Sequence, residues 1–129
     1  MIDKDRTPTR GEACVAGKVI CCIVPDDGTD LRLLMALRSE LGIIRANSTS
    51  CRGVAALGDV RTKRGKLPAP TLVKLIDVIV DEEQADTVFD FIFERANLAQ
   101  PGRGAMWQAP LIGCTRFALP EDVPNEKDI

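Results

Sequence analysis

The sequence predicts a single α+β domain built from two strand–helix–strand repeats that share one antiparallel sheet. Three observations lead to this prediction. The chain has 129 residues, enough for one domain and little more. Short runs rich in β-branched residues alternate with two segments of helical spacing. The resulting order is strand, helix, strand, long loop, strand, helix, turn, strand. Because two helices cover only one face of such a sheet, we expect the other face to be covered by self-association.

The first repeat follows an N-terminal arm, 1–17, which contains Pro and Gly, lacks periodicity and is expected to be flexible. Residues 18–25 form an apolar run that predicts a buried strand. Apolar residues at helical spacing over 31–41 predict an amphipathic helix, and Gly42 follows as its left-handed stop. We expect one of two side chains to cap the start of this helix, Thr29 or Asp30.

The second repeat is introduced by a more polar strand candidate, 43–54, and by a loop that is rich in Gly and Pro, 56–70. Residues 71–80 are the strongest strand candidate in the chain. The acidic residues 81–83 then favour the first turn of a second helix, because the helix dipole stabilises negative charge there. The apolar face of this helix is predicted to consist of Ala85, Val88, Phe89, Ile92, Phe93 and Ala96.

The last part of the chain is a glycine-rich turn, 100–104, followed by a strand candidate over 106–119 and a polar tail, 121–129. The turn follows a helix instead of preceding one, which excludes a Rossmann or Walker phosphate loop. Two glycines around Arg103 would still let backbone N–H groups approach an anion closely. On this motif alone, a helix stop joined to a turn is the favoured interpretation of the same residues.

Composition limits the classes of function. The net charge of −2 argues against broad electrostatic binding to nucleic acid. No apolar run is long enough to cross a bilayer, and the polar N-terminus shows no export signal. The five cysteines are odd in number and form no CxxC pair, which argues against a disulfide framework or a zinc site. We therefore expect a cytoplasmic protein.

Catalytic chemistry finds little support in the sequence. The absence of His excludes His-based triads and His metal ligands. The acidic clusters 26–27 and 81–83 each follow a strand and precede a helix, so helix capping explains them. We therefore predict a protein that is not an enzyme and that holds no metal.

Two groups of basic residues are candidates for binding. Arg116 lies in an apolar stretch, where it is either an edge charge in water or a ligand for phosphate or carboxylate. The other group lies in and before the 56–70 loop, which is either solvated or an interaction loop. Its members are Arg52, Arg61, Lys63, Arg64 and Lys66.

Four segments together resemble the PII signalling proteins over about 18–121: KVICCIVP (18–25), SELGIIRANSTSCRGVA (39–55), VKLIDVIVDEEQADTVFDFIFERANL (73–98) and PGRGAMW (101–107). Their order and spacing carry the resemblance. It implies a ferredoxin-like trimer in which adenine nucleotide lies in the clefts between subunits. It also implies an effector T-loop, here about 55–70, and a phosphate-binding B-loop, here about 100–105. The nucleotide-binding residues that it implies are Asn47, Gly53, Gly102, Arg103, Gly104 and Arg116.

Departures from the PII pattern suggest a divergent member of the superfamily. The positions of a T-loop Gln, a B-loop Lys and a second strand Arg are occupied here by Leu57, Ala105 and Ala118, and the chain has no Tyr to be modified. Fewer phosphate-binding cations favour ADP or AMP over a tightly held Mg-ATP. The chain is similar to PII-like proteins that accompany carboxysome or bicarbonate-transport genes. This similarity implies a regulator of a transporter or enzyme, with bicarbonate as a small effector.

Two other classes share the topology. One is a CutA-like trimer that binds no nucleotide and either holds a metal through its acidic clusters or serves as a scaffold. The other is a small enzyme of the acylphosphatase type, which needs a phosphate loop after the first strand. That position holds the acidic sequence Pro25-Asp26-Asp27-Gly28 instead.

Overall fold

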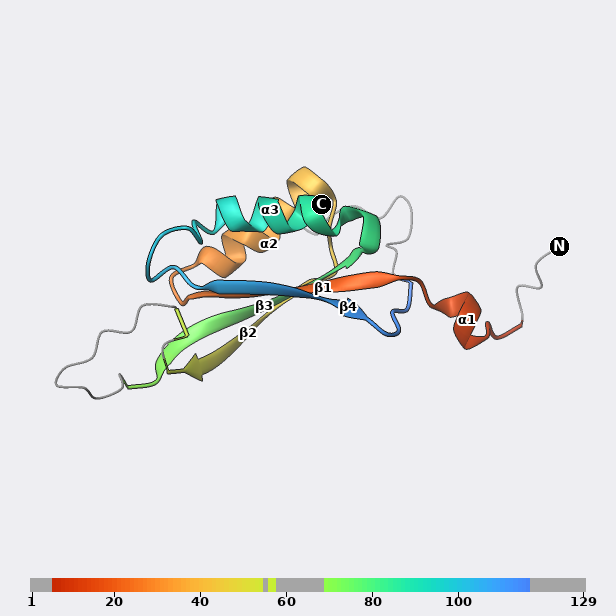
Figure 1. Ribbon diagram of the computed structural model, residues 1–129, viewed down its shortest axis with the longest axis horizontal. Coiled ribbons are helices and arrows are strands. Elements are labelled where there is room, and N and C mark those ends of the chain that lie inside the picture. The colour runs from red at the N-terminus through yellow and green to blue at the C-terminus, as the bar shows by residue number, and fades with distance from the viewer. Residues whose placement is uncertain (1–5, 55, 58–68, 117–129) are drawn as a thin grey trace, which may run out of the picture.

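Four strands form one antiparallel sheet in the order β2-β3-β1-β4, and helices α2 and α3 lie on the same face of it (Figure 1). The computed structural model describes residues 6–54, 56–57 and 69–116. The elements are α1 (Arg10–Ala13), β1 (Gly17–Pro25), α2 (Thr29–Leu41), β2 (Ala46–Gly53), β3 (Thr71–Asp81), the 3-10 helix η1 (Glu82–Gln84), α3 (Ala85–Arg95) and β4 (Ala105–Leu111). This confirms the predicted α+β class, the order of the elements and the ferredoxin-like arrangement.

The core lies between the sheet and the two helices. Alternate residues of β1, among them Ile20 and Cys22, are fully buried, as expected for a central strand. Leu37 of α2 and Ile92 of α3 pack into the same cluster. Gly42 ends α2 in the left-handed conformation, and its N–H donates to the carbonyl of Arg38, as the sequence predicts.

The opposite face of the sheet is mostly apolar, and no described helix covers it (Figure 1). The strand register places Cys21 of β1 between Asp77 of β3 and Trp107 of β4 on this face. Val19 and Ile23 flank Cys21 on the same side. Trp107 remains 45% exposed, an unusual position for so large an apolar side chain.

Several local predictions require correction. Part of the arm 1–17 is regular, because Thr9 caps the short helix α1 and Cys14 forms a bridge with Thr115. Thr29 and Asp30 are not the cap of α2, because both lie inside the helix and Gly28 occupies the cap position. Asp30 is buried and accepts a 2.5 Å hydrogen bond from the Ser48 hydroxyl.

The boundaries of the second repeat also differ from the prediction. The acids at 82–83 begin the 3-10 helix η1 and not α3 itself. Phe93, predicted to belong to the buried face of α3, is 41% exposed because the helix turns it away from the sheet. β2 begins at Ala46, later than predicted, and β4 ends at Leu111, well before 119.

Some predictions concern residues outside the described part of the chain. They are the central part of the T-loop, the tail 121–129, Ala118, and four of the five effector-loop cations: Arg61, Lys63, Arg64 and Lys66. Within the described part, Arg52 is exposed on β2. No helix there is both long and apolar enough to span a membrane.

Candidate functional site

The glycine-rich turn 100–104 packs its backbone directly against the sheet. Gly102 and Gly104 have φ angles of 78° and 129°, which side chains rarely adopt. A Cβ at Gly104 would lie 1.8 Å from the carbonyl oxygen of Ile23, so only glycine fits this approach. The N–H of Gly104 donates to the carbonyl of Leu57 at 3.2 Å. The turn is therefore bonded to the base of the predicted T-loop.

The Arg103 side chain extends from this turn to the start of α2. Its Nη1 donates to Asp27 Oδ2 at 3.1 Å, and its Nη2 donates to the hydroxyl of Thr29 at 3.0 Å. The Nε is buried and has no hydrogen-bond partner among the described residues. The guanidinium that the resemblance to PII proteins implies as a phosphate ligand is therefore paired with a carboxylate of the same chain.

Asp27 is fixed in this position by Thr29. Its Oδ1 accepts from the Thr29 hydroxyl at 2.5 Å and from the Thr29 backbone N–H at 3.1 Å. These hydrogen bonds, with a further contribution from Arg103, lower the pKa of Asp27 to about 2. The carboxylate is therefore charged at neutral pH, and any anion that binds Arg103 must compete with it.

The two predicted residues of β2 occupy different places. Gly53 ends β2 beside the base of the T-loop, and a Cβ there would lie 2.8 Å from the Cβ of Ala56. Gly53 therefore lies at the same end of the sheet as the glycine turn. Asn47 is exposed near the other end of β2, opposite Asp77.

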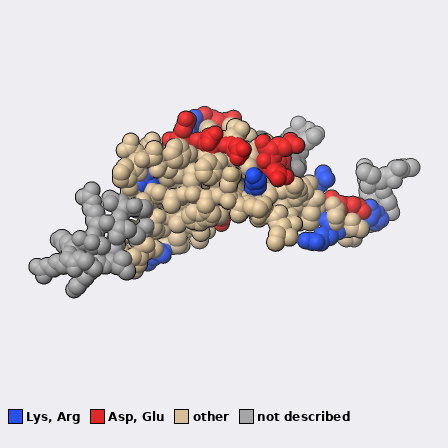
Figure 2. Space-filling view, viewed as in Figure 1, with Lys and Arg blue, Asp and Glu red and all other residues tan. Residues whose placement is uncertain are grey.

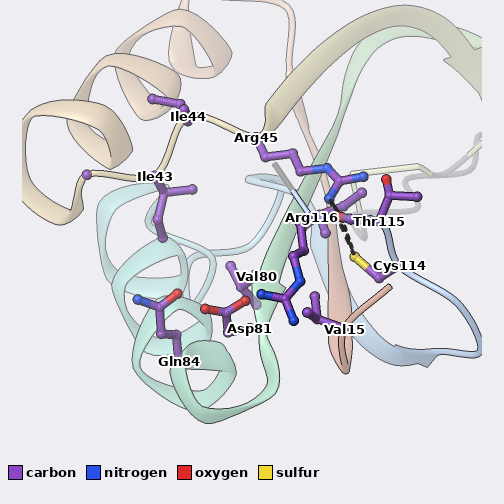
Figure 3. Close-up of a pocket in the computed structure, with 12 residues that line it drawn as sticks. Val15, Ile43, Ile44, Arg45, Val80, Asp81, Gln84, Cys114, Thr115 and Arg116 are labelled. Atoms are coloured by element: carbon purple, nitrogen blue, oxygen red, sulfur yellow. Dashed lines mark hydrogen bonds between the residues drawn. The ribbon is translucent and has the colours of Figure 1, made fainter. Parts of the chain in front are cut away.

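Arg116 lies beyond β4, not on it as predicted, and its N–H donates to the carbonyl of Ala13 at 2.9 Å. The segment is held by Arg45, whose Nη1 donates to the carbonyl of Thr115 at 2.6 Å. Arg116 lines a cavity of about 430 Å³, a volume within the usual range for small-molecule sites. Figure 3 shows Arg116, Asp81 and Gln84 directed into this cavity. Its apolar wall is formed by Val15, Ile43, Ile44, Ile79 and Val80.

The structure does not bring Arg103 and Arg116 together within one chain. Ala105, which follows the glycine turn, pairs with Ile23 near the end of β1. Leu111, which leads to Arg116, pairs with Gly17 at the start of β1. At about 3.3 Å per strand residue, these two ends are roughly 20 Å apart. A shared site that contains both arginines requires two copies of the chain.

The sequence analysis missed the partners of Arg103. Asp27 and Thr29 were assigned only to the turn and cap, although they follow β1 at the end of the sheet where the glycine turn also lies. The metal ligands considered for the CutA-like alternative are not gathered either. Among the described residues, no three Asp, Glu, Cys or His side chains come close enough to hold a metal ion.

The fold defines the class of this protein as a ferredoxin-like α+β domain, the fold of the PII and CutA proteins. No family model matches the sequence, and no curated protein matches it. A structure of Arabidopsis thaliana PII bound to citrate aligns with a TM-score of 0.55 at 19% identity, covering 74% of this chain and 77% of that one. CutA from Synechococcus elongatus aligns with a TM-score of 0.61 at 12% identity, covering 83% and 89%. At these identities the likeness concerns the fold.

Proposed function

We propose that this protein is a PII-like signalling protein that binds adenine nucleotide between copies of the chain and catalyses no reaction itself. The ligand is ADP or AMP, with ATP a weaker candidate. The observation that carries the proposal is the hydrogen bond between Gly104 and Leu57. This bond joins the glycine turn, whose backbone N–H groups suit phosphate, to the base of the predicted T-loop, which would contact a partner protein. A ligand on the turn can therefore alter the loop, as a switch requires.

Two copies of the chain would complete the site. One copy supplies Arg103 with the backbone N–H groups of the glycine turn, which suit phosphate oxygens. The other supplies the cavity beside Arg116, where Ile43 and Ile79 offer an apolar surface for a base. Arg103 and Arg116 lie at opposite ends of the sheet, which is incompatible with a site that contains both within one chain. A site formed between two copies is compatible with this placement.

The open face of the sheet supports assembly of several copies. Val19, Ile23, Leu75 and Ile79 share this face with the half-exposed Trp107. Burying an apolar face of this kind against other copies is favourable by about 25 cal/mol for each Å² of apolar area removed from water. A trimer is the proposed assembly. Through the 55–70 loop it would regulate a transporter or enzyme, with bicarbonate as a candidate effector, in the cytoplasm.

The proposal is tested by measuring mass in solution and ligand binding together. Light scattering is expected to give three chains per particle. A thermal-shift panel of AMP, ADP and ATP, with and without bicarbonate or 2-oxoglutarate, is expected to show a rise in Tm with ADP or AMP, because binding to the native state stabilises it. A monomer, or an assembly whose Tm no adenylate changes, would refute the proposal.

Arg103 provides the residue-level test. Replacing Arg103 with Ala removes a charged donor to phosphate and should weaken ADP binding by about 1–3 kcal/mol. Isothermal titration calorimetry measures this loss directly. The matched control is Arg38→Ala, because Arg38 is an exposed arginine of α2 that takes no part in the proposed site. Equal ADP affinity in wild type and Arg103→Ala would remove Arg103 from the site.

A CutA-like oligomer that binds no nucleotide is the second candidate. The specific observation in its favour is that the CutA structure overlaps more of this chain, and with a higher TM-score, than the PII structure does. Such a scaffold would form the trimer yet show the same Tm with every adenylate. The same two measurements therefore distinguish the candidates.

A further inference from the structure

A second cavity lies on the helix side of the glycine turn, between the start of α2 and the end of α3. Its volume is about 260 Å³. Three arginines from three separate parts of the chain line it, Arg32, Arg95 and Arg103, and no carboxylate does among the described residues. The rest of its described lining consists of Thr29, Leu33, Ala36 and Asn97.

Two of these guanidinium groups meet on one neutral oxygen. Arg32 Nη2 donates to the hydroxyl of Thr29 at 3.2 Å, and Arg103 Nη2 donates to the same oxygen at 3.0 Å. The two nitrogens therefore cannot be farther apart than the sum of these distances. Like charges this close repel each other, and an anion between them would relieve the repulsion.

The positive charge of the cavity is only partly compensated. Arg103 is paired with Asp27 and Arg95 is paired with Glu40, although neither carboxylate is among the residues that line the cavity. Arg32 has no carboxylate partner in the described part of the chain. The buried Nε of Arg103 adds a donor without an acceptor.

The surrounding surface makes this cavity distinct. Figure 2 shows acidic side chains gathered over the helix layer. The exposed acids of η1 and α3 are Glu82, Glu83, Asp86, Asp90 and Glu94. Positive charge is therefore a local property of the arginine cavity and does not extend along this side of the molecule.

We propose that this cavity binds a small oxyanion with at least two negative charges, a phosphoryl or a dicarboxylate compound. Guanidinium forks match the oxygens of both groups. The cavity is smaller than the range usual for drug-sized ligands, which favours a small anion over a whole nucleotide. The proposal does not rest on nucleotide binding, because Arg32 and Arg95 lie outside the proposed nucleotide site. Arg103 would belong to both sites and couple them.

Calorimetric titration of the full-length protein with inorganic pyrophosphate, and separately with succinate, tests the proposal and distinguishes the two anion classes. Saturable binding of either compound is expected. Arg32→Gln should weaken it about tenfold, the effect of one charge-assisted hydrogen bond. Arg38→Gln, the same change on an exposed part of the same helix, should leave it unchanged. Arg32→Lys keeps the charge without the fork and should give an intermediate affinity.

The result that overturns the proposal is the absence of saturable binding of both anions to wild type, or an equal affinity of wild type and Arg32→Gln. An ADP titration of the same samples separates this proposal from the nucleotide proposal. Arg32→Gln should retain the wild-type affinity for ADP. Binding of an anion without binding of ADP would support the arginine cavity and refute the nucleotide site. Binding of ADP without binding of either anion would support the nucleotide site and refute the arginine cavity.

Discussion

Replacing Asp27 with Asn should strengthen ADP binding if Arg103 holds a phosphate. The carboxylate of Asp27 lies 3.1 Å from Arg103 and, with its pKa lowered to about 2, is ionised at neutral pH. A phosphate that binds Arg103 must displace this charge. Asn still offers an oxygen to the Thr29 hydroxyl and N–H, so the turn should keep its structure.

The magnitude follows from the exposure of the pair. The side chains of Arg103 and Asp27 are 30% and 42% exposed, so solvent screening limits the ion pair to about 0.5–1 kcal/mol. The affinity for ADP should therefore rise about two- to fivefold in Asp27→Asn, measured by titration calorimetry. Asp26→Asn is the matched control. Asp26 lies in the same turn, but its carboxylate faces Lys74 at 3.8 Å, and its replacement should change little.

The double mutant decides whether the gain acts through Arg103. In an Arg103→Ala background, Asp27→Asn should no longer improve ADP binding, because the guanidinium for which Asp27 and the phosphate compete is absent. Unchanged or weaker ADP binding in Asp27→Asn alone would contradict the reasoning. It would show that Asp27 orients Arg103 for the ligand, and that the two do not compete.

Three further predictions follow from the same geometry. Neither Arg103→Ala nor Arg116→Ala should bind ADP well alone, but refolding the two variants together should restore tight sites, because one copy supplies each arginine. A mixture that binds ADP as weakly as its components would contradict a site shared between two copies. Gly104→Ala should lower the free energy of unfolding by about 1–3 kcal/mol, given the overlap with Ile23 and the positive φ. In urea titrations it should cost more than Gly42→Ala, whose Cβ would meet open space. Because the pKa of Asp27 is about 2 in the folded state and 3.8 for an ordinary Asp, its contribution to stability is present above pH 4 and lost as the pH falls toward 2. Wild type should therefore lose more stability than Asp27→Asn over this range; parallel pH profiles would contradict the assignment.

Local patterns were sufficient to predict most of the architecture. The apolar run of β1 corresponds to a buried strand, and the helical spacing of apolar residues in α3 corresponds to one buried helix face. Both patterns repeat within a few consecutive residues, so they are visible in the sequence. Gly42 could be predicted as the end of α2 for the same local reason, since its φ of 67° favours glycine. Phe93 shows where the pattern stops being sufficient. Helical spacing places it near the apolar face, but the width of the covered face is set by the sheet.

The candidate site was predicted only in part. The glycine turn could be found from its composition, and its close approach to Ile23 explains why glycine stands at position 104. The partner of Arg103 could not be found in this way. Asp27 is 76 residues away along the chain, and no local pattern relates the two.

The sequence by itself therefore determined the order and type of the elements, the apolar core and the glycine turn. Propensity and periodicity act over a few positions, so the local sequence is enough to predict these features. Chain folding alone placed Asp27 against Arg103, gathered three arginines around one cavity and separated Arg103 from Arg116 by the length of β1. These placements depend on strand register and on how α2 and α3 pack on the sheet, and both bring together residues that are far apart in the chain.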